Sequence, residues 1–244
     1  MTFKNTIFLS FTILTLVLFY TPLKNLMSLS LHYNELYSHM ILIPFVSGYF
    51  LYTRRKTIFS DTNYSYISGI TLMVIGVVFF LIGKSQGVKL DQNDYLSLMT
   101  FSTVTTWIGG FVFFFGMQAA REAAFPLLFL LFLIPIPSVV LEKVILLLQL
   151  GSTEASYGIF KLTGVLFVRE GPVFHLPGLS VEVAEQCSGI RSSLALFITS
   201  IIAGQLFLKT GWKKIVLSLS IFPITIFKNG LRVVTLSLLG VYVD

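Results

Sequence analysis

The chain has 244 residues, of which 55% are hydrophobic and 11% are charged, and its mean hydropathy is +0.86. A soluble domain of this length needs far more surface charge, so the composition excludes that class. The net charge of +6 comes from basic residues beside apolar segments. There they orient helices and meet anionic lipid, so they do not indicate nucleic-acid binding. The only cysteine, Cys187, has no partner for an internal disulfide or a cysteine-based zinc site.

Apolar segments long enough to cross a bilayer, which needs roughly 20 residues, recur along the chain. They cover about 6–23, 38–53, 66–83, 97–117, 123–149, 190–208 and 215–240, and the second is short unless it begins near Tyr37. Pro135-Ile136-Pro137 interrupts the fifth segment, because proline breaks or kinks a helix. We therefore predict a single all-α membrane-embedded domain over residues 1–244, with about seven transmembrane helices. A short strand-like loop, about 168–186, should precede the sixth helix, with Glu182 on its solvated face.

Basic residues in short loops predict the orientation of the helices. The cluster Arg54-Arg55-Lys56 belongs in the cytoplasm by the positive-inside rule. Cys187 then opens the sixth span at its outer end, and Arg232 lies about 25 Å along the seventh span, near the same surface. His39 lies near the outer end of the second span. We therefore expect a multi-pass protein of the inner or plasma membrane, with these three side chains converging on its extracytoplasmic face.

The residues around Cys187 are typical of an activated thiol. Ser188 and Gly189 follow it at the expected start of a helix, where backbone N–H groups stabilise a thiolate or a developing oxyanion. Arg191 would lie one turn along the same helical face and would favour the thiolate further. The plain alternative is a small buried hydrophobic residue with no chemical role.

Arg232 and His39 are the other candidate catalytic residues. An arginine within an apolar span is a functional hypothesis by default, although it can also snorkel to lipid phosphate. Arg232 can bind a carbonyl oxygen or an oxyanion but cannot act as a base. His39 can take or donate a proton, and its alternative role is a hydrogen bond to a neighbour. No His, Asp or Glu spacing suggests a metal site and no phosphate-binding loop is present, so we expect no cofactor.

Three segments carry a resemblance to a known family. They are Tyr37-Ser38-His39 with Ile43-Pro44 and Arg54-Arg55, the block from Gly178 to Arg191 containing Glu185-Gln186-Cys187-Ser188-Gly189-Ile190-Arg191, and Asn229-Gly230-Leu231-Arg232-Val233. The sequence resembles the exosortase/archaeosortase family of membrane-embedded cysteine transpeptidases. The resemblance implies that Cys187 is the nucleophile and Arg232 the catalytic arginine. Candidate substrate-binding residues are Arg191, Ser188, Gly189 and Asn229.

The family has a third catalytic basic residue after one further span. The sequence ends at Asp244, before that position. Either the sequence is a truncated or fragmentary form, or the third role falls elsewhere, and in the second case His39 is the candidate. The resemblance implies cleavage of C-terminal sorting tails, each a short motif, a transmembrane helix and a basic end, with transfer to a surface acceptor. The expected partners are exported proteins with such tails, together with membrane lipids. Two alternatives are an inactive family member that acts in assembly and a small-molecule transporter. A transporter would require paired broken helices and repeats, whereas the chain has one proline-interrupted segment and no repeat.

Overall fold

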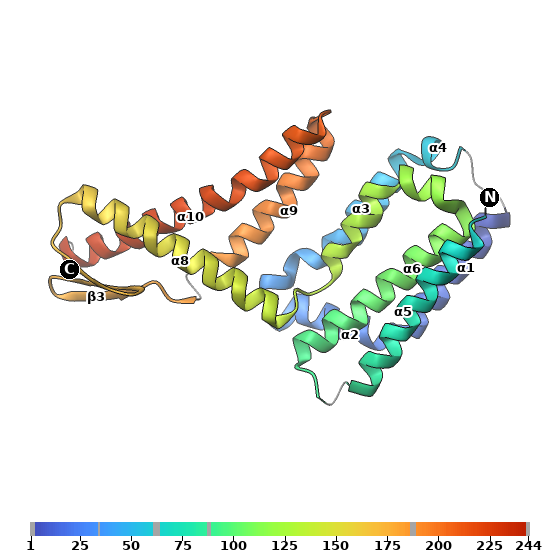
Figure 1. Ribbon diagram of the computed structural model, residues 1–244, viewed down its shortest axis with the longest axis horizontal. Coiled ribbons are helices and arrows are strands. Elements are labelled where there is room, and N and C mark those ends of the chain that lie inside the picture. Colours follow the sequence, from blue (N-terminus) through green and yellow to red (C-terminus); the bar gives the residue numbers. More distant parts are fainter. Residues whose placement is uncertain (1–2, 34, 61–63, 87–88, 186–188, 243–244) are drawn as a thin grey trace. The chain divides into compact units, whose positions relative to one another are not determined.

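The computed structural model describes residues 3–33, 35–60, 64–86, 89–185 and 189–242. These residues form two compact units, Met1–Ser138 and Val139–Asp244, each with its own packed helices (Figure 1). That the units form the single domain expected over residues 1–244 remains a prediction.

The first unit consists of helices joined by short connections. They are α1 (Phe3–Leu18), α2 (Tyr20–Ser28), η1 (Leu29–Tyr33), η2 (Glu35–Ile41), α3 (Leu42–Thr53), α4 (Arg55–Ile58), α5 (Tyr66–Gln86), α6 (Gln92–Glu122), α7 (Ala124–Phe129) and η3 (Leu130–Leu133). The first expected span is two helices bent by 68° near Phe19. The longest helix, α6, is kinked at Gly116, whose φ of +86° is a conformation that glycine adopts without steric cost.

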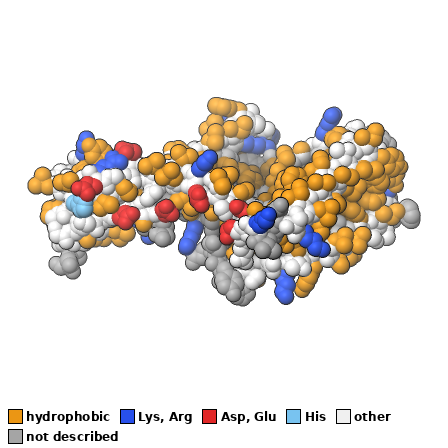
Figure 2. Space-filling model, turned by 60° about the horizontal axis from the view of Figure 1, so that its bottom comes forward, with side chains coloured by type: hydrophobic (Ala, Val, Ile, Leu, Met, Phe, Trp, Pro, Cys, Tyr) orange, Lys and Arg blue, Asp and Glu red, His pale blue; other side chains and the backbone are white. Residues whose placement is uncertain are grey.

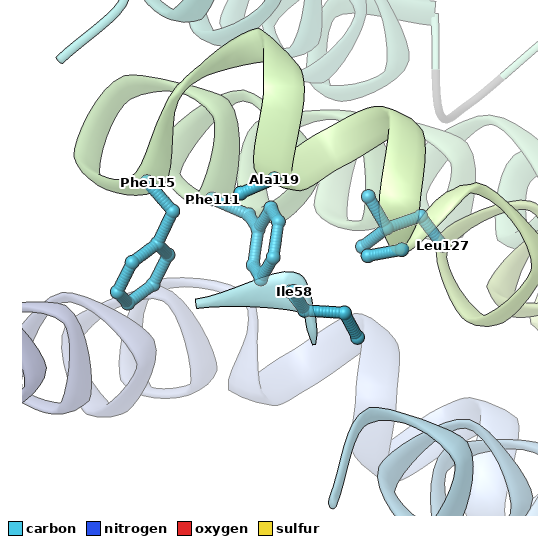
Figure 3. Close-up of a cluster of buried hydrophobic side chains, with 6 residues drawn as sticks. Ile58, Phe111, Phe115, Ala119 and Leu127 are labelled. Atoms are coloured by element: carbon cyan, nitrogen blue, oxygen red, sulfur yellow. The ribbon is translucent and has the colours of Figure 1, made fainter. Parts of the chain in front are cut away.

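Helices α5 and α6 pack closely along their length (Figure 1). A Cβ atom added at Gly109 would lie 2.7 Å from the backbone nitrogen of Met73, so only glycine permits this approach. Small residues at such crossings let backbones meet where lipid provides no hydrophobic driving force between helices. Beside this pair, Ile58, Phe111, Phe115, Ala119 and Leu127 form a buried cluster from α4, α6 and α7 (Figure 3).

The break at Pro135-Ile136-Pro137 is held by side chains at the start of α6. Ser97 donates a hydrogen bond to the carbonyl of Pro135 (2.6 Å), and Asn93 donates one to that of Ile136 (2.8 Å). The Asn93 carbonyl accepts from the Tyr37 hydroxyl at 2.6 Å. Burial, with the charges of Asp91 and Asp94, raises the pKa of Tyr37 above its usual value, so this phenol remains a donor. The predicted interruption is therefore confirmed, and the carbonyls of Pro135 and Ile136 accept hydrogen bonds from α6.

The second unit contains three helices and a small sheet. The elements are α8 (Ser138–Thr163), β1 (Val168–Glu170), β2 (Val173–Leu176), β3 (Leu179–Glu182), α9 (Ile190–Phe207) and α10 (Gly211–Tyr242). The strands are antiparallel in the order β1-β2-β3, with Val168 opposite His175 and Leu176 opposite Leu179. The strand-like loop expected before the sixth span is thus confirmed as a three-stranded sheet.

The sheet covers the adjoining ends of α8 and α10. Phe174 and Leu176 of β2 are buried in a cluster with Phe160 of α8 and Val233 and Val234 of α10. An ion pair between Arg169 of β1 and Glu154 of α8 (2.6 Å) adds a polar contact at the exposed side. Since exposed pairs of this kind contribute about 0–1 kcal/mol, the apolar cluster is the main attachment of the sheet to the helices.

Helix α10 crosses α8 at Gly230 (Figure 1). A Cβ atom added at this glycine would lie 2.7 Å from Cβ of Ala155 and 3.0 Å from the backbone nitrogen of Ser156. The neighbours are backbone and a short side chain, so they cannot move aside cheaply. Larger residues at Gly230 must therefore separate the two helices.

We expect Gly230→Val to lower the stability of the second unit by about 1–3 kcal/mol, the usual cost of overpacking. Thermal unfolding of the purified protein measures this loss. The matched control is Gly158→Val on α8, where an added Cβ meets nothing within 4 Å. Equal unfolding temperatures for the two variants would contradict the close crossing.

The fold class expected from the sequence is confirmed: this is an all-α polytopic membrane protein with one small sheet. Four helices among the described residues are long and apolar enough to cross a membrane, or up to six if each of two bent pairs counts as one span. The second of the seven expected spans is too short for a full span of roughly 20 residues, because its helix α3 has 12 residues. Hydrophobic side chains cover much of the visible surface of the first unit (Figure 2), as expected for a surface in contact with lipid.

Candidate functional site

The chain turns sharply at Gly189, immediately before α9. Its φ of +77° and ψ of +13° are left-handed, a conformation that costs other residues roughly 1–2 kcal/mol. Its carbonyl accepts hydrogen bonds from the Ser192 hydroxyl (3.0 Å) and from the backbone N–H and hydroxyl of Ser193 (both 2.9 Å). The end of the cysteine block is therefore held in one conformation.

Gly189 also packs against one face of α10. A Cβ atom added at Gly189 would lie 3.6 Å from Thr225 Cγ2 and 3.7 Å from Asn229 Cγ. Thr225 and Asn229 are one helical turn apart, and Arg232 follows Asn229 by three residues, which places it on a neighbouring part of the same helix surface. The segment that follows Cys187 thus lies within about one turn of Arg232.

Asn229 joins α10 to α8. It is only 2% exposed, and its amide nitrogen donates a hydrogen bond to the Ser152 hydroxyl at 2.9 Å. A buried amide requires such partners, and hydrogen bonds between helices are a common contact within membranes. Asn229 was predicted as a substrate-binding residue. Its hydrogen bond to α8 also fixes the part of α10 that Gly189 contacts.

Arg232 lines a pocket of about 160 Å³ between α10 and β3. The lining residues are Val181, Glu182, Asn229, Arg232, Val233, Leu236 and Ser237. Arg232 is exposed, and its guanidinium makes no hydrogen bond or ion pair with the residues that the structure describes. The walls are mainly apolar, with Glu182 as the one carboxylate among the lining residues. The pocket can therefore hold a group of about the size of one amino-acid residue, to which the guanidinium of Arg232 can donate hydrogen bonds.

Arg191 lies just after the turn that precedes α9. Helix α9 begins at Ile190, after the left-handed Gly189. The expected placement of Arg191 on one helical face with Cys187 remains a prediction. Arg191 is exposed on the first turn of α9. Cys187 and Ser188 lie outside the described residues, and their roles remain predictions.

His39 is half-buried in η2, within the first unit. Arg232 and Gly189 belong to the second unit, so the convergence of His39 with them remains a prediction. Elsewhere, Nδ1 of His175 lies 2.9 Å from the Ser180 hydroxyl and its Nε2 lies 3.5 Å from Glu170, which explains this histidine as part of the sheet. No group of three His, Cys, Asp or Glu residues that could hold a metal ion occurs in the described ranges.

Two contributors to the site were missed by the sequence reasoning. Ser152 was not singled out. Glu182 is exposed at the end of β3, as the prediction of a solvated strand face requires, but the sequence did not indicate that it lines the pocket with Arg232. The alternation of Val181, Glu182 and Val183 did indicate a strand, and Val183 is fully buried. This alternation carried no information about which helix the strand would approach.

Gly189→Ala should cost about 1–2 kcal/mol of stability, because alanine is strained at positive φ. It should also slow alkylation of Cys187 or cleavage, since it disturbs the turn that joins the cysteine block to α10. Gly171→Ala is the matched control: its φ of +60° brings the same strain in the sheet, and an added Cβ meets nothing within 4 Å. If both variants lose stability and activity equally, the turn at Gly189 has no specific role in the site.

The arrangement defines a class of protein, a multi-pass helical membrane protein with a candidate site beside a small sheet, where the start of α9 meets α10. Comparison with known families matches residues 30–244 to the family described as Transmembrane exosortase (Exosortase_EpsH). The chain belongs to this family. It has no significant match among curated proteins, and none among solved structures.

Proposed function

We propose that the chain is a membrane cysteine transpeptidase that cleaves C-terminal sorting tails of exported proteins and transfers the new C-terminus to a surface acceptor. Membership of the exosortase family supports this class of activity. The observation that carries the proposal is the packing of Gly189 against Asn229, one turn from Arg232. Two peptide units separate Gly189 from Cys187, so the covalent chain limits their Cα atoms to about 7 Å apart.

In the proposed mechanism, the thiolate of Cys187 attacks the scissile carbonyl carbon and forms a C–S bond. Arg232 stabilises the negative charge that develops on the carbonyl oxygen. Collapse of the intermediate breaks the C–N bond, and a basic group, for which His39 is the candidate, protonates the leaving amine. An acceptor amine, or water, then breaks the thioester. Covalent catalysis of this kind divides one difficult acyl transfer into two easier steps.

Arg191 and Asn229 would contact the substrate beside the nucleophile, together with backbone N–H groups at Ser188 and Gly189. The pocket between α10 and β3 supports this assignment, because a short recognition motif in extended form can lie along β3 with one residue in the pocket. The substrate's transmembrane helix would remain in the bilayer beside α9 and α10.

The length of α10 supports a site at a membrane surface. Its 32 residues extend about 48 Å, whereas the hydrocarbon core is about 30 Å thick. Arg232 is 21 residues from Gly211, about 32 Å along the helix and therefore close to the far surface. With the Arg54-Arg55-Lys56 cluster in the cytoplasm, we assign this surface to the extracytoplasmic side of the inner or plasma membrane.

The experiment that tests the proposal is detection of a thioester intermediate. A reporter ending in a motif, a transmembrane helix and a basic tail, taken from an exported protein of the same organism, is incubated with the purified protein without an acceptor amine. We expect an adduct of the protein and the amino-terminal product, which neutral hydroxylamine releases. Alkylation of Cys187 beforehand should prevent it. Cleavage that proceeds after complete alkylation would refute the proposal, and an inactive assembly subunit would give neither product nor adduct.

A further inference from the structure

The first unit contains an apolar groove of about 510 Å³ between α1, α2, α3 and α6. This volume falls within the range of about 300–1,000 Å³ that is typical of ligand pockets. Among the described residues that line the groove, none is charged. A charged or strongly polar ligand would lose its hydration there without compensation, so the lining selects an apolar occupant.

The groove opens on surface that faces lipid rather than water. Leu16, Met27 and Phe45 line it and are each more than half exposed. These helices belong to a multi-pass membrane protein, and large apolar side chains this exposed are stable only against hydrocarbon. An occupant therefore enters sideways from the bilayer.

The hydroxyl of Ser30, in the groove, has no hydrogen-bond partner among the described residues. The side chain of Ser30 is buried, with the residue 8% exposed, and its hydroxyl makes no hydrogen bond within the described chain. The hydroxyls of Thr15, Ser47 and Thr103 also line the groove, but each donates to a backbone carbonyl. Buried hydroxyls normally make a hydrogen bond, so we expect the occupant of the groove to supply an acceptor for the Ser30 hydroxyl.

The depth of the groove fits one leaflet of a bilayer. Its lining runs from Ile41, the last residue of η2, along α3 to Leu51, which is ten residues or about 15 Å. The hydrocarbon core is about 30 Å thick, so one leaflet accounts for half of that length. Ser30 belongs to η1, which packs against η2 at the Ile41 end of the groove. The hydroxyl therefore lies at one end of a channel as long as an acyl chain.

We propose that this groove binds one acyl chain of a membrane phospholipid, with the ester carbonyl accepting a hydrogen bond from Ser30. The acyl chain runs between α3 and the α1–α2 pair toward Leu51, and it covers apolar surface within the first unit. The residues that line the groove differ from the proposed catalytic residues, so each proposal can fail without the other.

The two tryptophans of the chain provide the readout, because Trp107 lines the groove and Trp212 does not. In a Trp212→Phe background, the fluorescence of Trp107 is measured in nanodiscs of phospholipid with brominated acyl chains, which quench at short range. Adding Gly48→Leu fills the groove, since a Cβ at Gly48 meets nothing within 4 Å. We expect most of the quenching of Trp107 to be lost.

Gly158→Leu in the same background is the matched control, because it makes the same change on an exposed helix position with open space around it. It should leave the quenching unchanged. Ser30→Ala should weaken quenching by brominated ester lipid and leave quenching by brominated ether lipid, which has no carbonyl, as it was. Equal quenching in the Gly48→Leu and Gly158→Leu proteins would overturn the proposal. The proposal would also be overturned if the groove crosslinked to the transmembrane helix of a tail-bearing reporter and that helix kept brominated lipid out of the groove.

Discussion

Replacing Cys187 by alanine should abolish cleavage of a tail-bearing reporter, with a loss of at least about 10⁴-fold, because no other thiol is available to form the covalent intermediate. Cys187→Ser should recover little of this activity, since a hydroxyl is far less ionised than a thiol at neutral pH. Cleavage is measured on gels as the loss of the reporter's helix and basic tail.

The Cys187→Ala protein should still bind the uncleaved reporter and should unfold at the same temperature as the original protein. These two measurements separate a missing nucleophile from a misfolded site. Normal processing by Cys187→Ala would remove the thiol from the mechanism. Loss of binding together with loss of cleavage would instead assign Cys187 to the structure of the segment before α9.

Arg232→Gln should lower the rate of cleavage by about 10²–10³-fold, the usual effect of removing one donor to a developing oxyanion. The guanidinium is exposed in its pocket, without an ion pair among the described residues, so little stability depends on it. Arg232→Lys should restore part of the rate, because the charge remains but the planar fork of donors is lost. The rate of formation of the thioester adduct measures the affected step.

Lys213→Gln is the control for charge, because it removes one exposed positive charge from the other end of α10. Its rate should match that of the original protein. An Arg232→Gln protein that forms the adduct at the normal rate would show that the guanidinium serves lipid binding instead. A lower unfolding temperature would mean that Arg232 stabilises the contact of α10 with β3.

Much of the fold could be predicted from local sequence signals. Hydropathy identified the apolar segments of α5, α6, α9 and α10, because a helix in lipid must satisfy its own backbone and present apolar side chains. Proline chemistry identified the break at 135–137. The sequence indicated that the second apolar segment is short, as α3 is, but it did not indicate the 3₁₀ turn of η2 that precedes this helix, because hydropathy records apolar length and not the type of helix.

Prediction of the site was less complete. The sequence indicated Cys187, Arg232 and Gly189, because a lone thiol, an arginine in an apolar segment and a glycine before a helix each have a chemical meaning of their own. It did not indicate Ser152, because a serine within an apolar helix is common and its partner Asn229 is 77 residues away. It also did not indicate the left-handed conformation of Gly189, which immediately precedes α9.

The sequence by itself determined that this is a membrane protein, which family it belongs to and which side chains carry the candidate chemistry. Composition, hydropathy and short motifs are sufficient for that, because each depends on neighbouring residues. Only the tertiary structure decided that Gly189 packs on α10, that β3 forms a pocket with Arg232, and that Ser30 is buried without a partner in an apolar groove. Those contacts depend on where helices cross, and the crossings arise from packing between residues far apart in the chain.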